Sequence, residues 1–245
     1  MATRFLTAAQ KSLPIRLCFM DCDGIVFNSN HLKTDAYRGA LRGMGVSLDE
    51  AERFVNEFHL ADVSVSRFVK FERFFAERGG DASVVAGKVE EALAAYSASC
   101  MKLYATLAPR REALAVADGM SHADGVYIVS GGSEEELRVV FGDEMHGIAS
   151  KFRAICGSPV VKIEHATRIL AETGIAAEET LFIGDGWTDF KTARAAGCAQ
   201  FLFIEEMSDW RDCDERIAKH PENVTRCATW ADALARFTFP AAVAR

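Results

Sequence analysis

The sequence predicts an α/β fold with a parallel sheet, flanking helices and an inserted helical segment. Several short apolar runs are continuous rather than alternating, as expected for strands that are covered on both faces. Helical patterns separate the later runs, which implies parallel strands joined by crossover helices. A long stretch after the first run contains no convincing strand. The predicted strands are residues 15–20, 126–129, 152–156, 181–183 and 201–204.

The second, third and fourth predicted strands are each followed by a helical pattern. Glycine at residue 197 is a plausible C-cap for the last of these helices, because glycine accepts the left-handed conformation common after a helix end. The predicted helices of this part are residues 133–141, 162–173 and 189–196.

The stretch from about residue 32 to residue 107 breaks the alternation of strand and helix. A connection between a strand and a helix normally takes a handful of residues, so this stretch predicts a separate unit. We therefore expect a catalytic core of residues 1–29 and 108–245 and an all-helical cap of residues 30–107. The insertion begins beside the suspected chemistry, which favours a lid hinged at residues 28–30 and 108–109 over a purely structural subdomain. The predicted cap helices are residues 31–42, 48–60, 65–78 and 83–106.

Size and composition exclude several classes of protein. A chain of 245 residues suits one large domain, or one domain with an insertion. The formal charge of −7 argues against a nucleic-acid or anionic-membrane surface. The seven cysteines include no C-x-x-C pair, which favours reduced thiols in a cytosolic protein over a zinc site or a disulfide framework. With no apolar stretch of membrane-spanning length and no signal-peptide core in residues 1–13, we expect a cytoplasmic location.

Two carboxylates one residue apart, Asp21 and Asp23, directly follow the first predicted strand. Strand side chains alternate with period two, so both should point the same way and Cys22 should point into the core. Two carboxylates this close repel each other, and one should keep its proton unless a bound cation stabilises both negative charges. A Mg²⁺ site accounts for the presence of both acids. One carboxylate would ligate the ion and attack the substrate, and the other would transfer protons.

The second strand ends in the sequence Ser130-Gly131-Gly132-Ser133. A hydroxyl followed by glycines at a helix N-terminus offers an anion one O–H group and several backbone N–H groups. The alternative is a structural role in which Ser133 caps the helix and Glu136 completes a capping box. Both can hold together, with Ser130 and Gly131 facing the ligand.

The fourth strand ends in a glycine turn that carries Asp185 and Asp189. Two acids in such a turn suit a hard cation with oxygen ligands, although Asp189 could simply cap the following helix. Lys162 opens another predicted helix; Lys151, which precedes its strand, is a rival for the same role, and a lone lysine is usually a solvated surface residue. The carboxyl ends of parallel strands are where open α/β sheets bind ligands.

In this order, the motifs resemble those of the haloacid dehalogenase superfamily, in the subgroup of phosphoglycolate phosphatase and β-phosphoglucomutase. The resemblance implies a Rossmann-like three-layer sandwich with a helical cap inserted between the first two motifs. The chain departs from the family pattern at Ile25, where Thr is usual, and at Ile163, where Pro often follows the lysine. The matching residues are Asp21, Asp23 and Gly24 with Ser29, then Ser130, then Lys162, then Asp185 and Asp189.

The resemblance also implies a role for each of these residues. Asp21 would attack phosphorus and form an aspartyl-phosphate, and Asp23 would protonate the leaving oxygen and then activate water. Mg²⁺ would be held by Asp21, the backbone carbonyl of Asp23, and Asp185. Asp189 would support Lys162 or the water shell of the metal. The groups that would hold the phosphoryl oxygens are Ser130, the Gly131 N–H and Lys162.

Among the reactions of the family, a phosphatase acting on a small phosphorylated metabolite fits best. The dehalogenase and phosphonate-hydrolysing branches lack the second acid of the first motif, and Asp23 is present here. A sugar-phosphate mutase is the first alternative. Such mutases usually carry a histidine at the apparent position of Lys33, whereas His31 is offset by two residues. A catalytically silent relative that binds a phosphorylated ligand is the second alternative. The sequence leaves open a monomer or a homodimer.

The cap should select the substrate, and residues 63–70 are its expected reading surface. Arg67 and Lys70 lie three residues apart and therefore share a helix face. Together with Lys33 they could contact a second anionic group of the substrate. The alternative is a solvated basic helix face. Trp187 could either line the pocket or cover the sheet edge.

Overall fold

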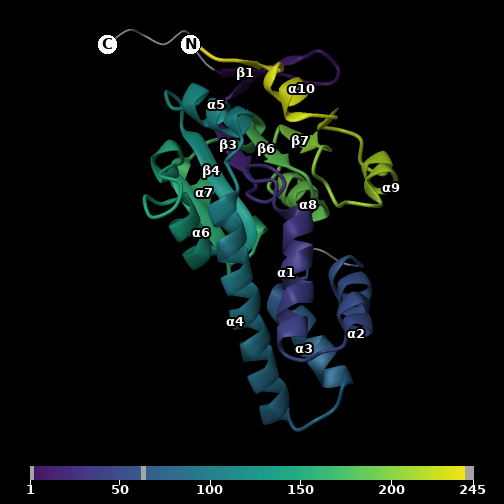
Figure 1. Cartoon of the computed structure of the whole chain (residues 1–245). Coiled ribbons are helices and arrows are strands. Elements are labelled where there is room, and N and C mark those ends of the chain that lie inside the picture. Colours follow the sequence, from purple (N-terminus) through teal and green to yellow (C-terminus); the bar gives the residue numbers. More distant parts are fainter. Residues whose placement is uncertain (1–2, 62–64, 241–245) are drawn as a thin grey trace. The chain divides into compact units, whose positions relative to one another are not determined.

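The computed structural model describes residues 3–61 and 65–240 of the chain. The chain divides into two compact units (Figure 1). The core unit comprises residues Met1–Asn28 and Ala108–Arg245, and the helical unit comprises residues Ser29–Leu107. The boundaries therefore fall between Asn28 and Ser29 and between Leu107 and Ala108.

The core unit contains a six-stranded sheet in which every neighbouring pair is parallel. The spatial order is β5-β4-β3-β6-β7-β8, so the first strand of the sheet along the chain lies at its centre. This confirms the predicted α/β class with a parallel sheet. The strands are β3 (Leu17–Met20), β4 (Gly125–Ser133), β5 (Ala154–Ser158), β6 (Thr180–Gly184), β7 (Gln200–Ile204) and β8 (Val224–Cys227).

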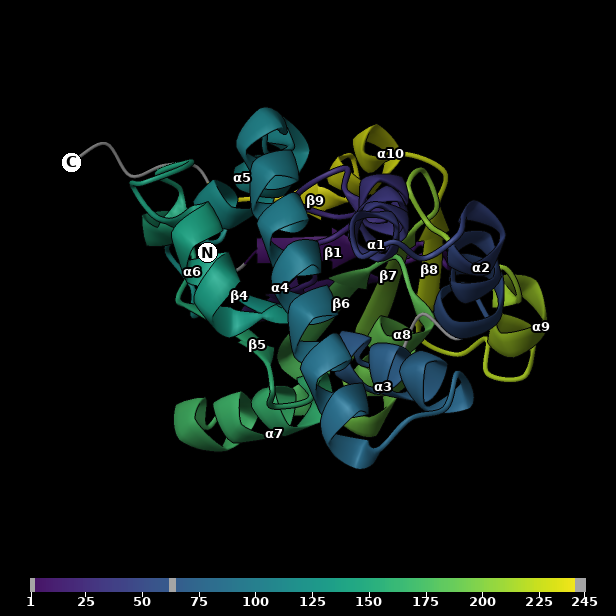
Figure 2. The same ribbon diagram turned by 60° about the horizontal axis from the view of Figure 1, so that its bottom comes forward.

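Helices cover both faces of this sheet, which explains why the strand sequences are continuously apolar. Phe19, Phe182 and Phe201 from adjacent strands form one buried cluster with residues of α7 and α8. Their strand neighbours point to the opposite face. Figure 2 shows α7 on one side of the sheet and α5 and α10 on the other. Helices α5 and α10 contact each other. The helices are α5 (Arg111–Gly119), α6 (Glu134–Phe141), α7 (Lys162–Thr173), α8 (Trp187–Ala195), α9 (Cys213–Ala218) and α10 (Trp230–Leu234), with short 3₁₀ turns η2 (Ala149–Lys151) and η3 (Ala177–Glu179).

The prediction of one strand over residues 15–20 is wrong. Ile15 ends a different strand, β2 (Ser12–Ile15), and the parallel strand β3 begins at Leu17. Strand β2 pairs antiparallel with β1 (Thr3–Leu6), and β1 pairs with β9 (Phe237–Thr238). Both Ile15 and Leu17 are fully buried, so hydrophobicity alone does not reveal the change of sheet. The third predicted strand is also displaced, because β5 begins two residues later than expected.

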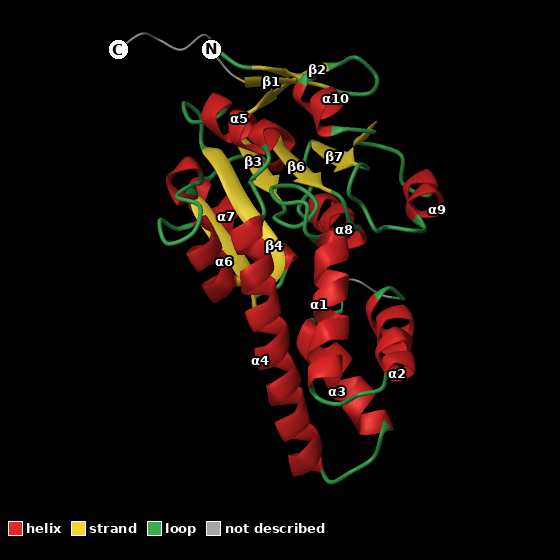
Figure 3. Ribbon diagram, viewed as in Figure 1, coloured by secondary structure: helices red, strands yellow, loops and turns green. Residues whose placement is uncertain are grey.

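The helical unit contains helices and no strand among its described residues (Figure 3). One predicted helix, residues 48–60, is in fact two different helices. A short α-helix is followed by a π-helical segment, in which the Leu60 N–H donates to the Val55 carbonyl at 2.8 Å, five residues earlier. The helices are α1 (Asn30–Gly43), α2 (Leu48–Arg53), η1 (Phe54–His59), α3 (Arg67–Glu77) and α4 (Ala82–Thr106).

None of the helices in the described part of the chain has the length and hydropathy needed to cross a membrane.

Candidate active site

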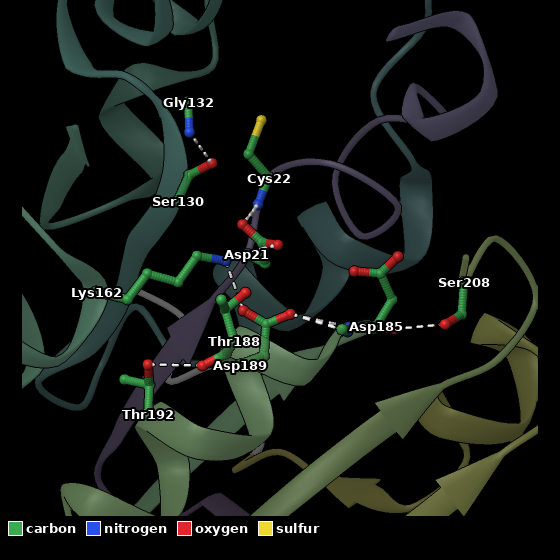
Figure 4. Close-up of polar contacts among 11 residues, drawn as sticks. Asp21, Cys22, Ser130, Gly132, Lys162, Asp185, Thr188, Asp189, Thr192 and Ser208 are labelled. Atoms are coloured by element: carbon green, nitrogen blue, oxygen red, sulfur yellow. Dashed lines mark hydrogen bonds and ion pairs between the residues drawn. The ribbon is translucent and has the colours of Figure 1, made fainter. Parts of the chain in front are cut away.

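Four segments of the core unit bring polar side chains to the carboxyl edge of the parallel sheet (Figure 4). Asp21 follows β3, Ser130 lies in the irregular end of β4, Asp185 follows β6, and Lys162 is the first residue of α7. Asp21, Ser130, Lys162 and Asp185 are all buried, with exposed fractions between 1% and 9%. The edge is therefore a buried polar cluster on an apolar sheet, the arrangement that open α/β sheets use for ligands.

Lys162 joins two of the acids. Its Nζ lies 2.9 Å from Asp21 Oδ2 and 2.6 Å from Asp189 Oδ1. Burial alone would lower the pKa of Lys162, but the charges of Asp189 and Asp21 raise it above its ordinary value. The ammonium group is therefore charged and holds Asp21 and Asp189 on either side of it.

Asp189 also fixes the turn that carries Asp185. Its Oδ2 accepts from the Gly186 N–H at 3.0 Å and from the Asp185 N–H at 3.3 Å. Gly184 makes this approach possible, because a Cβ at that position would lie 2.4 Å from the Cβ of Asp189. Both carboxylate oxygens of Asp189 are thus occupied by the protein itself.

Burial changes the protonation of Asp21 more than any other influence. It raises the pKa of Asp21 to about 7; the nearby Asp189 and Asp23 act in the same direction, and Lys162 acts against them. Desolvation disfavours the charged form of a carboxyl group, and a bound cation would favour it again. One oxygen, Oδ1, also accepts from the Cys22 N–H at 2.7 Å.

The donor set at this edge fits a hard divalent cation. Ligand oxygens of Asp21, Asp185 and Asp189 all lie within 4.8 Å of one another. Oxygens on opposite sides of an octahedral Mg²⁺ are about 4.2 Å apart, so small side-chain adjustments bring two of these carboxylates to ligand distance. Asp21 and Asp185 are the better candidates, because Asp189 is already committed to Lys162 and the turn.

The irregular end of β4, residues 130–133, forms a loop with a hydroxyl group that could donate to a small anion. The Ser130 hydroxyl oxygen accepts from the Gly132 N–H at 3.1 Å, which leaves its O–H to donate. The loop is anchored from β5, where Ser158 Oγ donates to the Gly132 carbonyl at 3.1 Å. Ser133 caps α6 by accepting from the Glu136 N–H at 3.5 Å, so the structural reading of Ser133 is confirmed. A Cβ at Gly131 would meet only the Lys162 side chain, at 4.0 Å.

Asp23 is half-buried in a tight loop that follows Asp21. Gly24 in this loop has a φ of +73°, a conformation that side-chain-bearing residues rarely adopt. The buried Trp230 holds the loop from α10, since its Nε1–H donates to the Ile25 carbonyl at 2.9 Å. Ile25 is fully buried, so this position packs where a threonine is usual.

Two other residues considered in the sequence make their contacts with other side chains. Lys151 pairs with Asp118 at 2.6 Å; the Asp118 side chain is exposed and the Lys151 side chain is half-buried. Trp187 begins α8 and packs in an aromatic group with Phe190 and Trp210, with the Arg216 guanidinium 4.0 Å above its ring. Trp187 therefore packs against aromatic side chains of the core unit.

The three basic residues singled out in the insertion gather within the helical unit, each over a tyrosine ring. The cation-to-ring distances are 5.4 Å for Lys33 over Tyr104, 5.4 Å for Arg67 over Tyr96, and 5.8 Å for Lys70 over Tyr37. Tyr37 and Tyr96 are themselves stacked, with ring centres 4.1 Å apart. We call these six residues the tyrosine–cation cluster. Of the expected reading surface, Val63 and Ser64 lie outside the described residues.

His59, at the end of the π-helix, joins this cluster and was not predicted from the sequence. Lys70 Nζ lies 3.2 Å from its Nδ1, and Thr34 Oγ1 lies 3.1 Å from its Nε2. An ammonium group can only donate, so Nδ1 accepts and Nε2 carries the ring proton. Burial, followed by the charges of Lys70 and Lys33, lowers the pKa of His59 to about 3.

The family model of haloacid dehalogenase-like hydrolases matches residues 15–197, which is most of the chain. The chain belongs to this family. Among curated proteins, none matches the sequence significantly. The matched range covers all four strand-end motifs and the helical unit. Below, cap is used as a label for the helical unit and core as a label for the other unit.

Solved structures of haloacid dehalogenase-like hydrolases share this fold. CbbY from Rhodobacter sphaeroides, in complex with phosphate, is 17% identical over 89% of this chain and 96% of that chain, with a TM-score of 0.66. A haloacid dehalogenase-like protein from Streptococcus pneumoniae is 19% identical over 90% of this chain and 97% of that chain, with a TM-score of 0.64. A predicted phosphoglycolate phosphatase from Haemophilus somnus is 14% identical over 78% and 85% of the two chains, with a TM-score of 0.62. These likenesses confirm the Rossmann-like fold.

Proposed function

We propose that this haloacid dehalogenase-like hydrolase is a Mg²⁺-dependent phosphatase of small organic phosphate monoesters, acting through an aspartyl-phosphate on Asp21. The observation that carries the proposal is the buried group of Asp21, Asp185 and Asp189, whose ligand oxygens lie within 4.8 Å of one another, with Lys162 in contact with Asp21 and Asp189. Phosphoryl transfer depends mostly on positioning and charge neutralisation, and this group supplies both.

In the first step, a carboxylate oxygen of Asp21 attacks the phosphorus atom and the bond to the ester oxygen breaks. Asp23 gives its proton to that leaving oxygen, so the product departs as an alcohol. In the second step Asp23 takes a proton from water, the water oxygen attacks phosphorus, and the carboxylate of Asp21 is released. Asp21 must be ionised to attack. Because its pKa is about 7, a nearby cation would increase the fraction of Asp21 that is charged.

The phosphoryl oxygens would be held by Ser130, the Gly131 N–H and Lys162. Asp189 keeps Lys162 charged and aimed at Asp21 through its 2.6 Å contact. Mg²⁺ would be held by Asp21, the Asp23 carbonyl and Asp185, and when bound it would neutralise the charge of the phosphoryl group.

For the cap, we propose that Lys33, Arg67 and Lys70 contact a second anionic group of the substrate. Three cations lie over tyrosine rings in this region, and burial, followed by the charges of Lys70 and Lys33, lowers the pKa of His59 beside them. A carboxylate or a second phosphate suits such a region. The substrate class is then a phosphate ester with an additional acidic group.

The test is a panel of small phosphate esters assayed with and without Mg²⁺. We expect release of inorganic phosphate only with Mg²⁺ and a preference for 3-phosphoglycerate over glycerol 3-phosphate, which differ in one carboxylate. Turnover that survives chelation of divalent cations would contradict the proposal.

The same panel separates the two alternatives retained from the sequence. Incubation with hexose 1-phosphates would yield the isomeric sugar phosphate if the protein were a mutase, and inorganic phosphate if it is a phosphatase. A catalytically silent relative would bind these esters without converting any of them. His31 is exposed at the start of α1, so the structure gives the mutase no further support.

A further inference from the structure

Both backbone polar groups of Asp185 are held by hydrogen bonds. The Asp185 N–H donates to Asp189 Oδ2 at 3.3 Å, and the Asp185 carbonyl accepts from Ser208 Oγ at 2.5 Å (Figure 4). The first contact comes from four residues away, within the same motif. The second comes from a loop 23 residues further along the chain, after β7, which no motif of the sequence singled out.

Ser208 is itself fixed from two directions. Its N–H donates to the Glu205 carbonyl at 3.1 Å, and its hydroxyl oxygen accepts from the Trp210 N–H at 3.1 Å. Accepting from Trp210 orients the hydroxyl so that its proton is donated to Asp185. Trp210 is 7% exposed and packs against Phe190 and Phe203, so the loop has a rigid anchor in the core.

We propose that Ser208 is a positioning residue that holds the Asp185 carboxylate in place for the divalent cation. The inference rests on the metal site of the proposed function. A hydroxyl-to-carbonyl bond at this turn fixes the rotation of the peptide group that follows Asp185, and with it the direction of the side chain. Outer contacts of this kind orient ligands, and their loss typically weakens metal binding by about 10–100-fold.

The experiment is binding of Mn²⁺, used in place of Mg²⁺, to the whole chain without substrate, followed by electron paramagnetic resonance. Ser208→Ala removes the hydroxyl, and Ser208→Thr keeps it. Thr192→Ala is the matched control, because Thr192 Oγ1 donates to the Thr188 carbonyl at 2.7 Å within α8 and not to the Asp185 carbonyl. Asp185→Asn reports on the metal site itself.

We expect Ser208→Ala to raise the Kd for Mn²⁺ by about tenfold, and Ser208→Thr to restore it to within about threefold of the unsubstituted chain. Thr192→Ala should leave the Kd unchanged. The inference is overturned if Asp185→Asn abolishes binding while Ser208→Ala binds normally, or if Thr192→Ala weakens binding equally. A chain that binds no Mn²⁺ at all would overturn the proposed metal site, and this inference with it.

Discussion

The acids at the sheet edge and the tyrosine–cation cluster of the cap stabilise buried ionisable groups in different ways. At the sheet edge, Lys162 is charged and lies within 2.9 Å of two carboxylates, so opposite charges compensate one another. In the cap, Lys70 lies over the Tyr37 ring and donates to a neutral histidine. The first arrangement suits a site that must bind a cation and a phosphoryl group together. The second concentrates positive charge, which suits recognition of an anion.

The largest effect is expected at the nucleophile of the acidic site. Asp21→Asn should lower kcat by at least about 10³-fold, since an amide cannot form the acyl phosphate. Burial already disfavours the charged form of Asp21, so the Tm of the Asp21→Asn variant should differ little from that of the unsubstituted chain. Asp124→Asn, which alters an exposed acid paired with Arg16, is the control and should keep full activity. Activity of Asp21→Asn close to that of the unsubstituted chain would refute the assignment.

The second-largest effect is expected on the free energy of unfolding when the charge of Lys162 is removed. Lys162→Met should lower the free energy of unfolding by about 3–5 kcal/mol, because Asp21 and Asp189 would then be buried without their partner. Lys151→Met removes an exposed pair and should cost less than about 1 kcal/mol. Urea denaturation of both variants at one pH measures the difference. Equal losses would mean that Lys162 is not the centre of the acidic cluster.

A smaller effect is expected on folding stability at acidic pH, through His59 of the cap. Folding holds the pKa of His59 at about 3, whereas the unfolded chain protonates it near 6.5. Below pH 6.5 the unfolded state therefore binds the extra proton, and stability falls by up to about 1.4 kcal/mol per pH unit, or roughly 2 kcal/mol at pH 5. His59→Phe should lack this part of the pH dependence.

The measurement is the free energy of unfolding of both chains between pH 7.5 and pH 5. Other titrating groups are common to the two chains, so the difference isolates His59. Parallel pH profiles would contradict this account, because they would show that folding does not lower the pKa of His59.

The smallest of these effects concerns substrate choice. Lys70→Met should raise the KM for 3-phosphoglycerate about tenfold more than the KM for glycerol 3-phosphate, because a charge-assisted hydrogen bond to the carboxylate is lost. Lys88→Met removes an exposed lysine of the same unit and should alter neither value. A Lys70→Met variant that changes both KM values equally would remove the cap from anion recognition.

The sequence predicts the central sheet and the strand-end motifs because both are local patterns. Continuous apolar runs give β4, β6 and β7 to within a few residues, and Lys162 does begin its helix. The terminal sheet is different, since Arg4 pairs with both Pro14 and Thr238 and the second pairing joins the two ends of the chain. The pattern of apolar residues within a short stretch of sequence cannot predict a contact between residues so far apart in the chain.

The residues that sequence reasoning missed act through tertiary contacts. His59, at the end of a π-helical segment, contacts Lys70 of α3, and Ser208 contacts Asp185 across 23 residues. Neither belongs to a motif with fixed spacing. A histidine beside a predicted basic helix face is the one signal that could have directed attention to His59.

The central claim is that Asp21 carries the phosphoryl group during turnover. Rapid acid quench of the chain with Mg²⁺ and a phosphate ester labelled at phosphorus traps any covalent intermediate, and mass spectrometry assigns it. We predict a hydroxylamine-sensitive label on the peptide that contains Asp21, absent in Asp21→Asn. Phosphate release without any label on the protein, or a label on another residue, would contradict this account.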